Sequence, residues 1–153
     1  HGGVVLVTQA NFSDLDEGAV NMTGGTLHLI DSDIRRCRAN RGPALHLSGG
    51  VATVAGSQFE ENEAAVSGGA VQVDGGTLLM SSRTQLKRNR APRGMGTSLE
   101  VSADGAASYQ LPVPPAHWVF IPAGGLGATG DFDVMQLGAG RYDDDFLTPA
   151  LQV

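Results

Sequence analysis

The sequence is poor in the residues that build many small functional sites. Its 153 residues include one cysteine and four histidines, and aromatic residues make up 5% of the chain. A single cysteine excludes an intrachain disulfide framework. No apolar run approaches the roughly 18 residues that a membrane-spanning helix requires, so we expect no membrane-spanning segment. The formal net charge of −6 gives no electrostatic footprint for phosphates, so we expect no nucleic-acid partner.

Glycine, by contrast, is abundant. The 22 glycines are about 14% of the chain, twice the roughly 7% of an average protein. Hydrophobic residues, at 41%, are enough for a packed core and argue against disorder. The chain begins with His1-Gly2-Gly3, without a methionine or a signal-peptide core, and we interpret it as part of a longer protein.

The glycines belong to a repeat. Glycine pairs precede apolar runs at intervals of 22, 25 and 26 residues: Gly2-Gly3, Gly24-Gly25, Gly49-Gly50 and Gly75-Gly76. A second series has a small residue followed by an apolar–polar–apolar triplet, in 19–22, 44–47, 70–73 and 98–101. A third series is a single apolar anchor at Phe12, Ile34, Phe59 and Leu86. Short runs that alternate between polar and apolar residues predict strands with one buried face.

These strands predict an all-β fold, a parallel β-helix of about four coils over residues 1–107. Turns of one to three residues cannot hold a helical crossover, so each strand must pair with the same strand of the next repeat. Each coil then has about 24 residues in three strands, and coils stack about 4.8 Å apart. The inward columns are predicted to be Val20/Leu45/Val71/Leu99, Met22/Leu47/Val73/Val101, Val5/Leu27/Ala52/Leu78 and Val7/Leu29/Val54/Met80, with the four anchors on the third side.

A polar stretch follows each anchor. Its fourth place holds Asn62 and Asn89, which predicts an inward asparagine ladder whose amides bond to successive backbones. Leu15 and Cys37 take this place in the first two coils, so we interpret Cys37 as a buried ladder residue rather than a nucleophile.

The charges in this stretch change sign from coil to coil. Opposite charges stacked at strand spacing attract and like charges repel, so we interpret the stretch as a solvated face suited to stacking. The alternating groups are Asp14 and Asp16, then Arg35, Arg36 and Arg38, then Glu60, Glu61 and Glu63, then Lys87, Arg88 and Arg90.

The third coil carries two paired motifs, Phe59-Glu60-Glu61-Asn62 and Gly68-Gly69-Ala70-Val71. They resemble the F-x-x-N and G-G-A-(I/L/V) repeats of the chlamydial polymorphic outer-membrane proteins, which also occur in large surface or secreted proteins of algae and protists. The resemblance covers residues 1 to about 105; coil three matches in full, and coil four keeps Asn89. It implies a right-handed β-helix of the pectin-lyase-like fold, placed at a cell surface and used for adhesion.

The residues from 108 to 153 have a different character. Pro112, Pro114, Pro115 and Pro122 exclude a regular strand or helix between them. Large apolar side chains at Tyr109, Trp118 and Phe120 favour a segment that caps the open end of the β-helix, with a ligand-binding aromatic site as the alternative.

Two tail motifs suggest ligands, and we expect neither a cofactor nor a metal. Gly125, Gly127 and Gly130 match G-x-G-x-x-G, but this dinucleotide fingerprint needs a strand before it and a helix after it, and Pro122 precedes it here. We interpret Asp143–Asp145 as a solvated acidic run rather than a calcium site.

No catalytic residue is predicted. Polysaccharide lyases and hydrolases of this fold need clustered acids, or acids with a basic residue, in a groove, and the outward column Asn21/His46/Gln72/Glu100 offers one acid only. Asn11 and Asn21 begin N-x-S/T sequons and are candidate glycosylation sites of a secreted protein.

The hypothesis from sequence is therefore a non-catalytic β-helix segment of a large secreted or membrane-anchored surface protein. It would act outside the cell as a scaffold or adhesion surface for an unknown surface protein or glycan, with more coils in the full-length chain. The alternative is a polysaccharide-binding or polysaccharide-cleaving β-helix.

Overall fold

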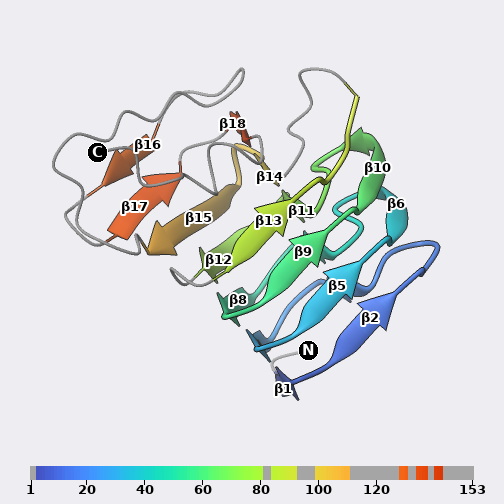
Figure 1. Ribbon diagram of the computed structural model, residues 1–153. Coiled ribbons are helices and arrows are strands. Elements are labelled where there is room, and N and C mark those ends of the chain that lie inside the picture. Colours follow the sequence, from blue (N-terminus) through green and yellow to red (C-terminus); the bar gives the residue numbers. More distant parts are fainter. Residues whose placement is uncertain are drawn as a thin grey trace, which may run out of the picture.

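The computed structural model describes residues 3–80, 84–92, 99–110, 128–130, 134–137 and 140–142, which form strands and turns and contain no helix. The strands stack in three walls (Figure 1). The first wall contains β1 (Val4–Thr8), β4 (Thr26–Ile30), β8 (Val51–Ala55), β12 (Gly76–Met80) and β15 (Gly105–Gln110). The second contains β2 (Asn11–Ser13), β5 (Asp33–Arg35), β9 (Gln58–Glu60) and β13 (Gln85–Lys87). The third contains β3 (Val20–Met22), β7 (Leu45–Leu47), β11 (Val71–Val73) and β14 (Leu99–Val101).

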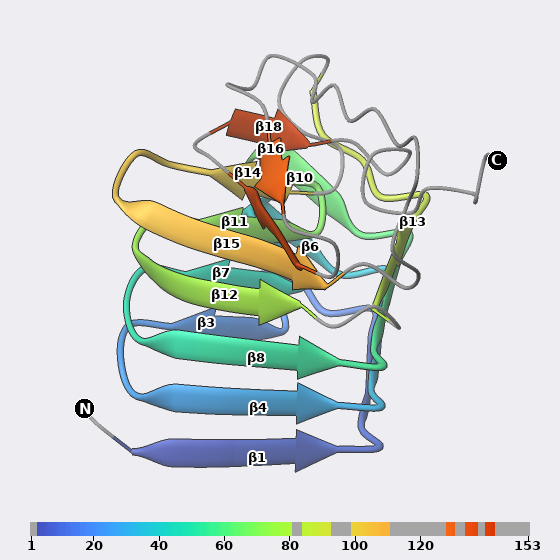
Figure 2. The same cartoon turned by 90° about the vertical axis from the view of Figure 1, so that its left-hand side faces the viewer.

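Every pairing within these walls is parallel, which confirms the predicted β-helix. Each strand pairs with its equivalent one coil away, as in Leu27 opposite Ala52 and Val71 opposite Leu45. In Figure 2 the chain passes along the first wall, turns back through the second and returns behind through the third while it climbs from β1 to β15. This course is a right-handed helix.

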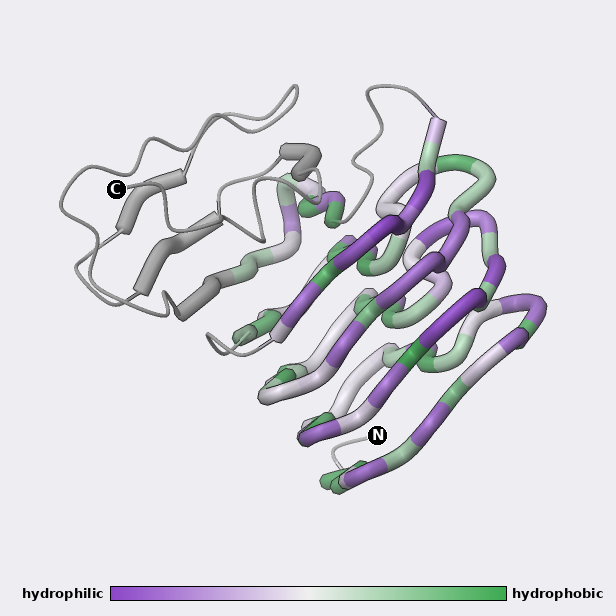
Figure 3. The backbone as a smooth tube through the Cα atoms, in the orientation of Figure 1, coloured by the Kyte–Doolittle hydropathy of each residue, from purple (hydrophilic) through white to green (hydrophobic). Residues whose placement is uncertain are grey.

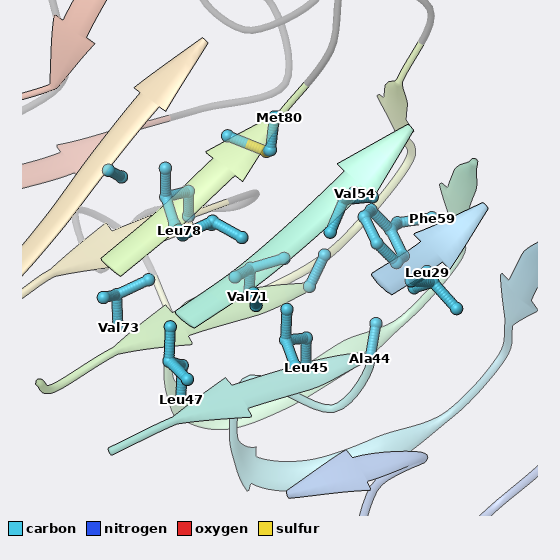
Figure 4. Packing of buried hydrophobic residues seen from close by; sticks show 14 of the residues in the cluster. Leu29, Ala44, Leu45, Leu47, Val54, Phe59, Val71, Val73, Leu78 and Met80 are labelled. Carbon is cyan, nitrogen blue, oxygen red and sulfur yellow. The ribbon is translucent and has the colours of Figure 1, made fainter. Parts of the chain in front are cut away.

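The predicted inward columns form the core in coils two to four. Phe59 fills the second wall and Leu45 and Val71 the third, all fully buried (Figure 4). Ile34, beside Phe59 in the second wall, is fully buried as well. In the second wall each apolar anchor lies between hydrophilic residues along the chain (Figure 3). The alternation arises because successive side chains of a strand point to opposite faces of the sheet.

Glycine at the corners lets adjacent coils approach closely. Gly50 has a φ of +88°, and a Cβ atom there would lie 2.5 Å from the carbonyl oxygen of Gly25 in the coil before. A residue with a side chain would therefore meet both backbone strain and a steric clash. The recurring glycine pairs reflect this approach.

Two expectations about the coils are wrong. Coils two and three have a fourth strand each, β6 (Arg38–Arg41) and β10 (Glu63–Ser67), which pair in a ladder of their own. Val5 has the predicted position opposite Leu27, but it is 55% exposed and Leu27 is 5% exposed. Coil one is the end of the described stack, so its inward face is covered on one side only.

Gln72 is assigned to the outward column, and an exposed side chain is expected there. This expectation is wrong, because the side chain is fully buried. Gln72 does point away from the apolar core, but the turn after β10 covers it. The Ser67 hydroxyl donates to Gln72 Oε1 at 3.0 Å, and Gly68 lies against the same oxygen. A polar side chain on the outer face is thus sealed by the preceding turn of its own coil.

The far end of the stack carries antiparallel strands. β17 (Val134–Leu137) pairs with β15 and with β16 (Ala128–Gly130), and β18 (Gly140–Tyr142) pairs with β14. This arrangement fits the predicted irregular cap over the last coil. β15 itself continues to Gln110, and the proline-rich residues 111–127 lie outside the described part of the chain.

The inward and outward faces of β12 give a test of the core. Leu78 is fully buried and its neighbour Leu79 is 40% exposed. We expect Leu78→Asp to prevent cooperative folding, because it buries an unpaired charge. Leu79→Asp should change the free energy of unfolding by no more than about 1 kcal/mol. Thermal melts followed by circular dichroism measure both, and equal melting temperatures would contradict the assignment of faces.

Candidate functional site

The asparagines of the repeat motif form the predicted ladder between coils. Asn62 is fully buried; its Oδ1 accepts the Cys37 N–H at 3.0 Å, and its Nδ2 donates to the Ile34 carbonyl at 3.0 Å. Asn89 repeats the arrangement one coil on: its Oδ1 accepts the Asn62 N–H at 3.0 Å and its Nδ2 donates to the Phe59 carbonyl at 3.0 Å. The amides therefore satisfy backbone groups that the turn would leave unpaired.

Cys37 occupies the ladder place in coil two, as expected. The side chain is fully buried, and its Sγ donates to the Arg35 carbonyl at 3.4 Å. Burial raises the pKa of the Cys37 thiol, which disfavours the reactive thiolate. Leu15, at the equivalent place in coil one, is 37% exposed.

The second half of the motif, Gly68-Gly69-Ala70-Val71, forms the corner from β10 into β11, and all four residues are buried. Gly68 has a φ of +60°, and a Cβ atom there would lie 2.5 Å from the Val71 carbonyl oxygen. The residues of the two motifs therefore lie in the interior or at its corners: Phe59, Asn62, Gly68, Gly69, Ala70, Val71 and Asn89.

A second buried ladder was missed by the sequence analysis. Ser32 Oγ accepts the Ala10 N–H at 3.1 Å, and Ser57 Oγ accepts the Ser32 N–H at 3.2 Å. Thr84 continues the column and donates to the Val54 carbonyl at 3.2 Å. The available signal was a small residue two places before each apolar anchor, which in three coils carries a hydroxyl.

The charged turns lie in register, as predicted. Asp14, Arg36, Glu61 and Arg88 share a left-handed backbone, with φ between 51° and 58°. Arg36 donates to both carboxylate oxygens of Asp14, from Nε at 2.7 Å and from Nη2 at 2.9 Å, and it holds the pKa of that carboxyl below its ordinary value. Two coils further on, between coils three and four, Arg88 Nε donates to Glu61 at 3.2 Å. The stack is therefore tied by pairs of opposite charge along its outer edge.

A groove of about 790 Å³ lies where the β6–β10 ladder meets the third wall. Charged residues of both signs line it together with polar groups: Glu17, Arg38, Asn40, Arg41, His46 and Glu63. Arg41 and Asn40 are exposed residues of β6. The groove does not follow from the sequence pattern, because the repeat predicts neither β6 nor β10.

His46 connects this groove to a polar network on the outside of the third wall. Its Nε2 lies 2.8 Å from Asp74 Oδ2. Because an ionised carboxylate only accepts hydrogen bonds, the histidine donates from Nε2. Asp74 Oδ1 also accepts from Gln72 Nε2 and from Ser102 Oγ, both at 2.7 Å. Glu100 Oε1 lies 3.4 Å from the same Gln72 nitrogen.

The outward column itself holds one acid, Glu100, as expected, but the network places a second acid beside that column. Asp74 follows β11 directly, and its carboxylate comes close to that of Glu100 because both accept from Gln72. Burial raises the pKa of the Asp74 carboxyl, but hydrogen bonds from Ser102, His46 and Gln72 outweigh it and hold that pKa below its ordinary value. Asp74 is therefore kept ionised.

The candidate glycosylation sites, the other histidines and the tail motifs are dispersed along the chain. Asn11 and Asn21 are exposed in β2 and β3, accessible to modification, and His28 lies half-buried on β4. His1, His117, the glycines at 125 and 127 and the acidic run 143–145 lie outside the described residues. Within the described part, no group of three or more His, Cys, Asp or Glu side chains is arranged to hold a metal ion. That same part contains no helix long and apolar enough to cross a membrane.

No protein-family model, no curated protein and no solved structure matches this chain. The β-solenoid architecture is therefore established by the parallel pairing of the described strands alone.

The charged column gives a salt-dependent prediction. Glu61→Lys places a positive charge between Arg36 and Arg88, whereas Glu61→Gln only removes an attraction. We expect Glu61→Lys to be the more destabilising by about 0.5–1.5 kcal/mol. The difference should shrink towards 1 M salt, where the screening length is about 3 Å. Denaturant titrations at low and high salt measure it; identical midpoints at low salt would show that these side chains do not interact.

The Asp74 network gives a pH-dependent prediction. A carboxyl whose pKa is lower in the folded state stabilises the fold above its unfolded pKa of about 3.9, and this contribution is lost as pH falls through the folded pKa. We expect Asp74→Asn to be less stable than the parent at pH 7, with a difference that shrinks below about pH 4. Urea midpoints between pH 7 and pH 2.5 test this. Asp104→Asn, in an exposed turn, is the control, and a pH-independent effect of Asp74→Asn would contradict the prediction.

Proposed function

We propose that this chain is a non-catalytic β-helix segment of a large secreted or membrane-anchored surface protein, where it acts as a scaffold and adhesion surface. The observation that carries the proposal is the use of the polar side chains. The contacts Arg36–Asp14, His46–Asp74 and Asn62–Asn89 each join residues one coil apart. In other proteins such side chains can carry out catalysis. In this chain they bind one coil to the next, which we expect to make the stack stiff.

The surface location is supported by two further features. The paired motifs of coil three resemble repeats of surface proteins, and the candidate glycosylation sites Asn11 and Asn21 are both exposed. The groove beside the third wall offers an unknown surface protein or glycan a set of exposed polar groups, among which are Asn40 and Arg41.

The second candidate is a polysaccharide-binding or polysaccharide-cleaving β-helix. It is favoured by the approach of Asp74 and Glu100 beside His46. A general acid at neutral pH needs a raised pKa, and the hydrogen bonds of Asp74 shift its pKa in the other direction. The network therefore supports a structural role better than an acid catalyst.

A glycan array combined with a reducing-sugar assay separates these two functions. We expect any glycan that binds to be released unchanged, and its binding to be weakened by Arg41→Ala. Lys87→Ala, an exposed basic residue on the second wall and away from the groove, should bind like the parent. Turnover of a polyuronate that Glu100→Gln abolishes and Lys87→Ala retains would contradict the scaffold and establish the enzyme.

A further inference from the structure

The two ends of the stack differ. At one end, β17 and β18 pair with β15 and β14, the last strands of the first and third walls; β18 lies above β14 in Figure 2. At the other end, β1, β2 and β3 are each the outermost strand of their sheets. All three walls thus end in an edge strand on the same face, which we call the coil-one face.

The coil-one face exposes an apolar side chain at a place that the interior coils bury. Val5 lies in the inward column opposite Leu27 and is 55% exposed, whereas Val4 and Leu6 lie on the outer side of β1, where they are 70% and 63% exposed. Proteins commonly protect edge strands with lysine, proline or a bulge, and β1 (Val-Val-Leu-Val-Thr) has none of these. An edge of this kind is a template for a further strand, whose backbone would pair with it and whose side chains would cover its apolar row.

The corner residues show how a coil would join this face. The Val51 N–H donates to the Gly25 carbonyl at 2.9 Å, and the Thr77 N–H donates to the Gly50 carbonyl at 2.9 Å. The carbonyl of Gly3 has the same place, since it accepts the Thr26 N–H at 2.8 Å. A coil attached through Gly3 would therefore enter the stack by the corner that coils two and three use.

The charged column specifies the coil that fits. Glu61 is paired with Arg88 on one side, and on its other side it contributes to the field at Arg36. Asp14 is paired with Arg36 on one side, and its other side belongs to the coil-one face. Asp16, likewise, is bridged through its backbone to Arg38 only on the side of coil two. A basic turn opposite these two acids would continue the alternation, and an acidic turn would break it.

We propose that the coil-one face accepts a further coil of the same repeat, carried in the same polypeptide, whose turn places Lys or Arg opposite Asp14 and Asp16. The coil pairs in parallel with β1, β2 and β3 and covers Val5 and Leu15. This holds whether the protein is a scaffold or an enzyme.

Two matched fusions test the proposal. In the first, a copy of Thr26–Gly50, which carries the basic turn of coil two, replaces the residues before Val4. In the second, the same copy carries Arg36→Glu and Arg38→Glu, so that only the sign of the turn differs. Both copies end in the Gly49-Gly50 corner and so enter in the same register. Thermal melts and limited proteolysis in reducing buffer at about 10 mM salt, where the screening length is about 30 Å, measure the result.

We expect the basic coil to resist proteolysis and to raise the melting temperature above that of the acidic fusion by at least about 3 °C. In a background with Asp14→Lys and Asp16→Lys the order of the two fusions should reverse. If protease trims both added coils back to the parent chain, the face does not accept a coil. If both coils are protected and melt alike, a coil is accepted but the charge rule is overturned.

Discussion

Parallel pairing between successive coils is the constraint from which the rest of this structure follows. Because each strand of the three walls bonds to its equivalent one coil away, a strand residue inside the stack lies directly above and below residues of the same place in the repeat. Each side chain must therefore fit against the equivalent side chains of the neighbouring coils, which lie about 4.8 Å away. Apolar residues meet this condition on the inside, as Leu45 and Val71 do, and glycine meets it at the corners.

Polar residues meet the same condition in two different ways. An amide carries both donors and acceptors, so Asn62 and Asn89 can stack upon each other and bond together in the buried ladder. A carboxylate or a guanidinium carries one sign only, so the column that contains Asp14, Arg36, Glu61 and Arg88 must change sign at each step. Amides are thus suited to the inside of a turn, and alternating charges to its solvated outside.

This column logic explains which parts of the fold could be predicted from the sequence. The inward series and the asparagine ladder repeat at a fixed place, so the alternation of residue types reveals them. The burial of Gln72 could not be predicted, because the Ser67 turn that covers it lies in the same coil and follows no periodic pattern. The exposure of Val5 could not be predicted for another reason. The sequence of β1 resembles that of an interior strand, and Val5 is exposed only because β1 is the end strand of the described sheet. Asp74 is not predicted as a site residue because it lies just after a strand, where the alternating strand pattern makes no prediction.

Specific recognition should then depend on the residues that depart from the repeat. A residue that must match its column has little freedom to vary, whereas the β6–β10 ladder departs from strict stacking. Its register shifts between Ala64 and Ser67, because β10 contains one residue more than β6 over the same stretch. Such a bulge re-aims the side chains around it. The groove lies beside this irregular ladder, and Asn40 and Arg41, which line it, are exposed. The regular columns hold each coil to the next, and under the proposed adhesion function the irregular corner is where a binding specificity would arise.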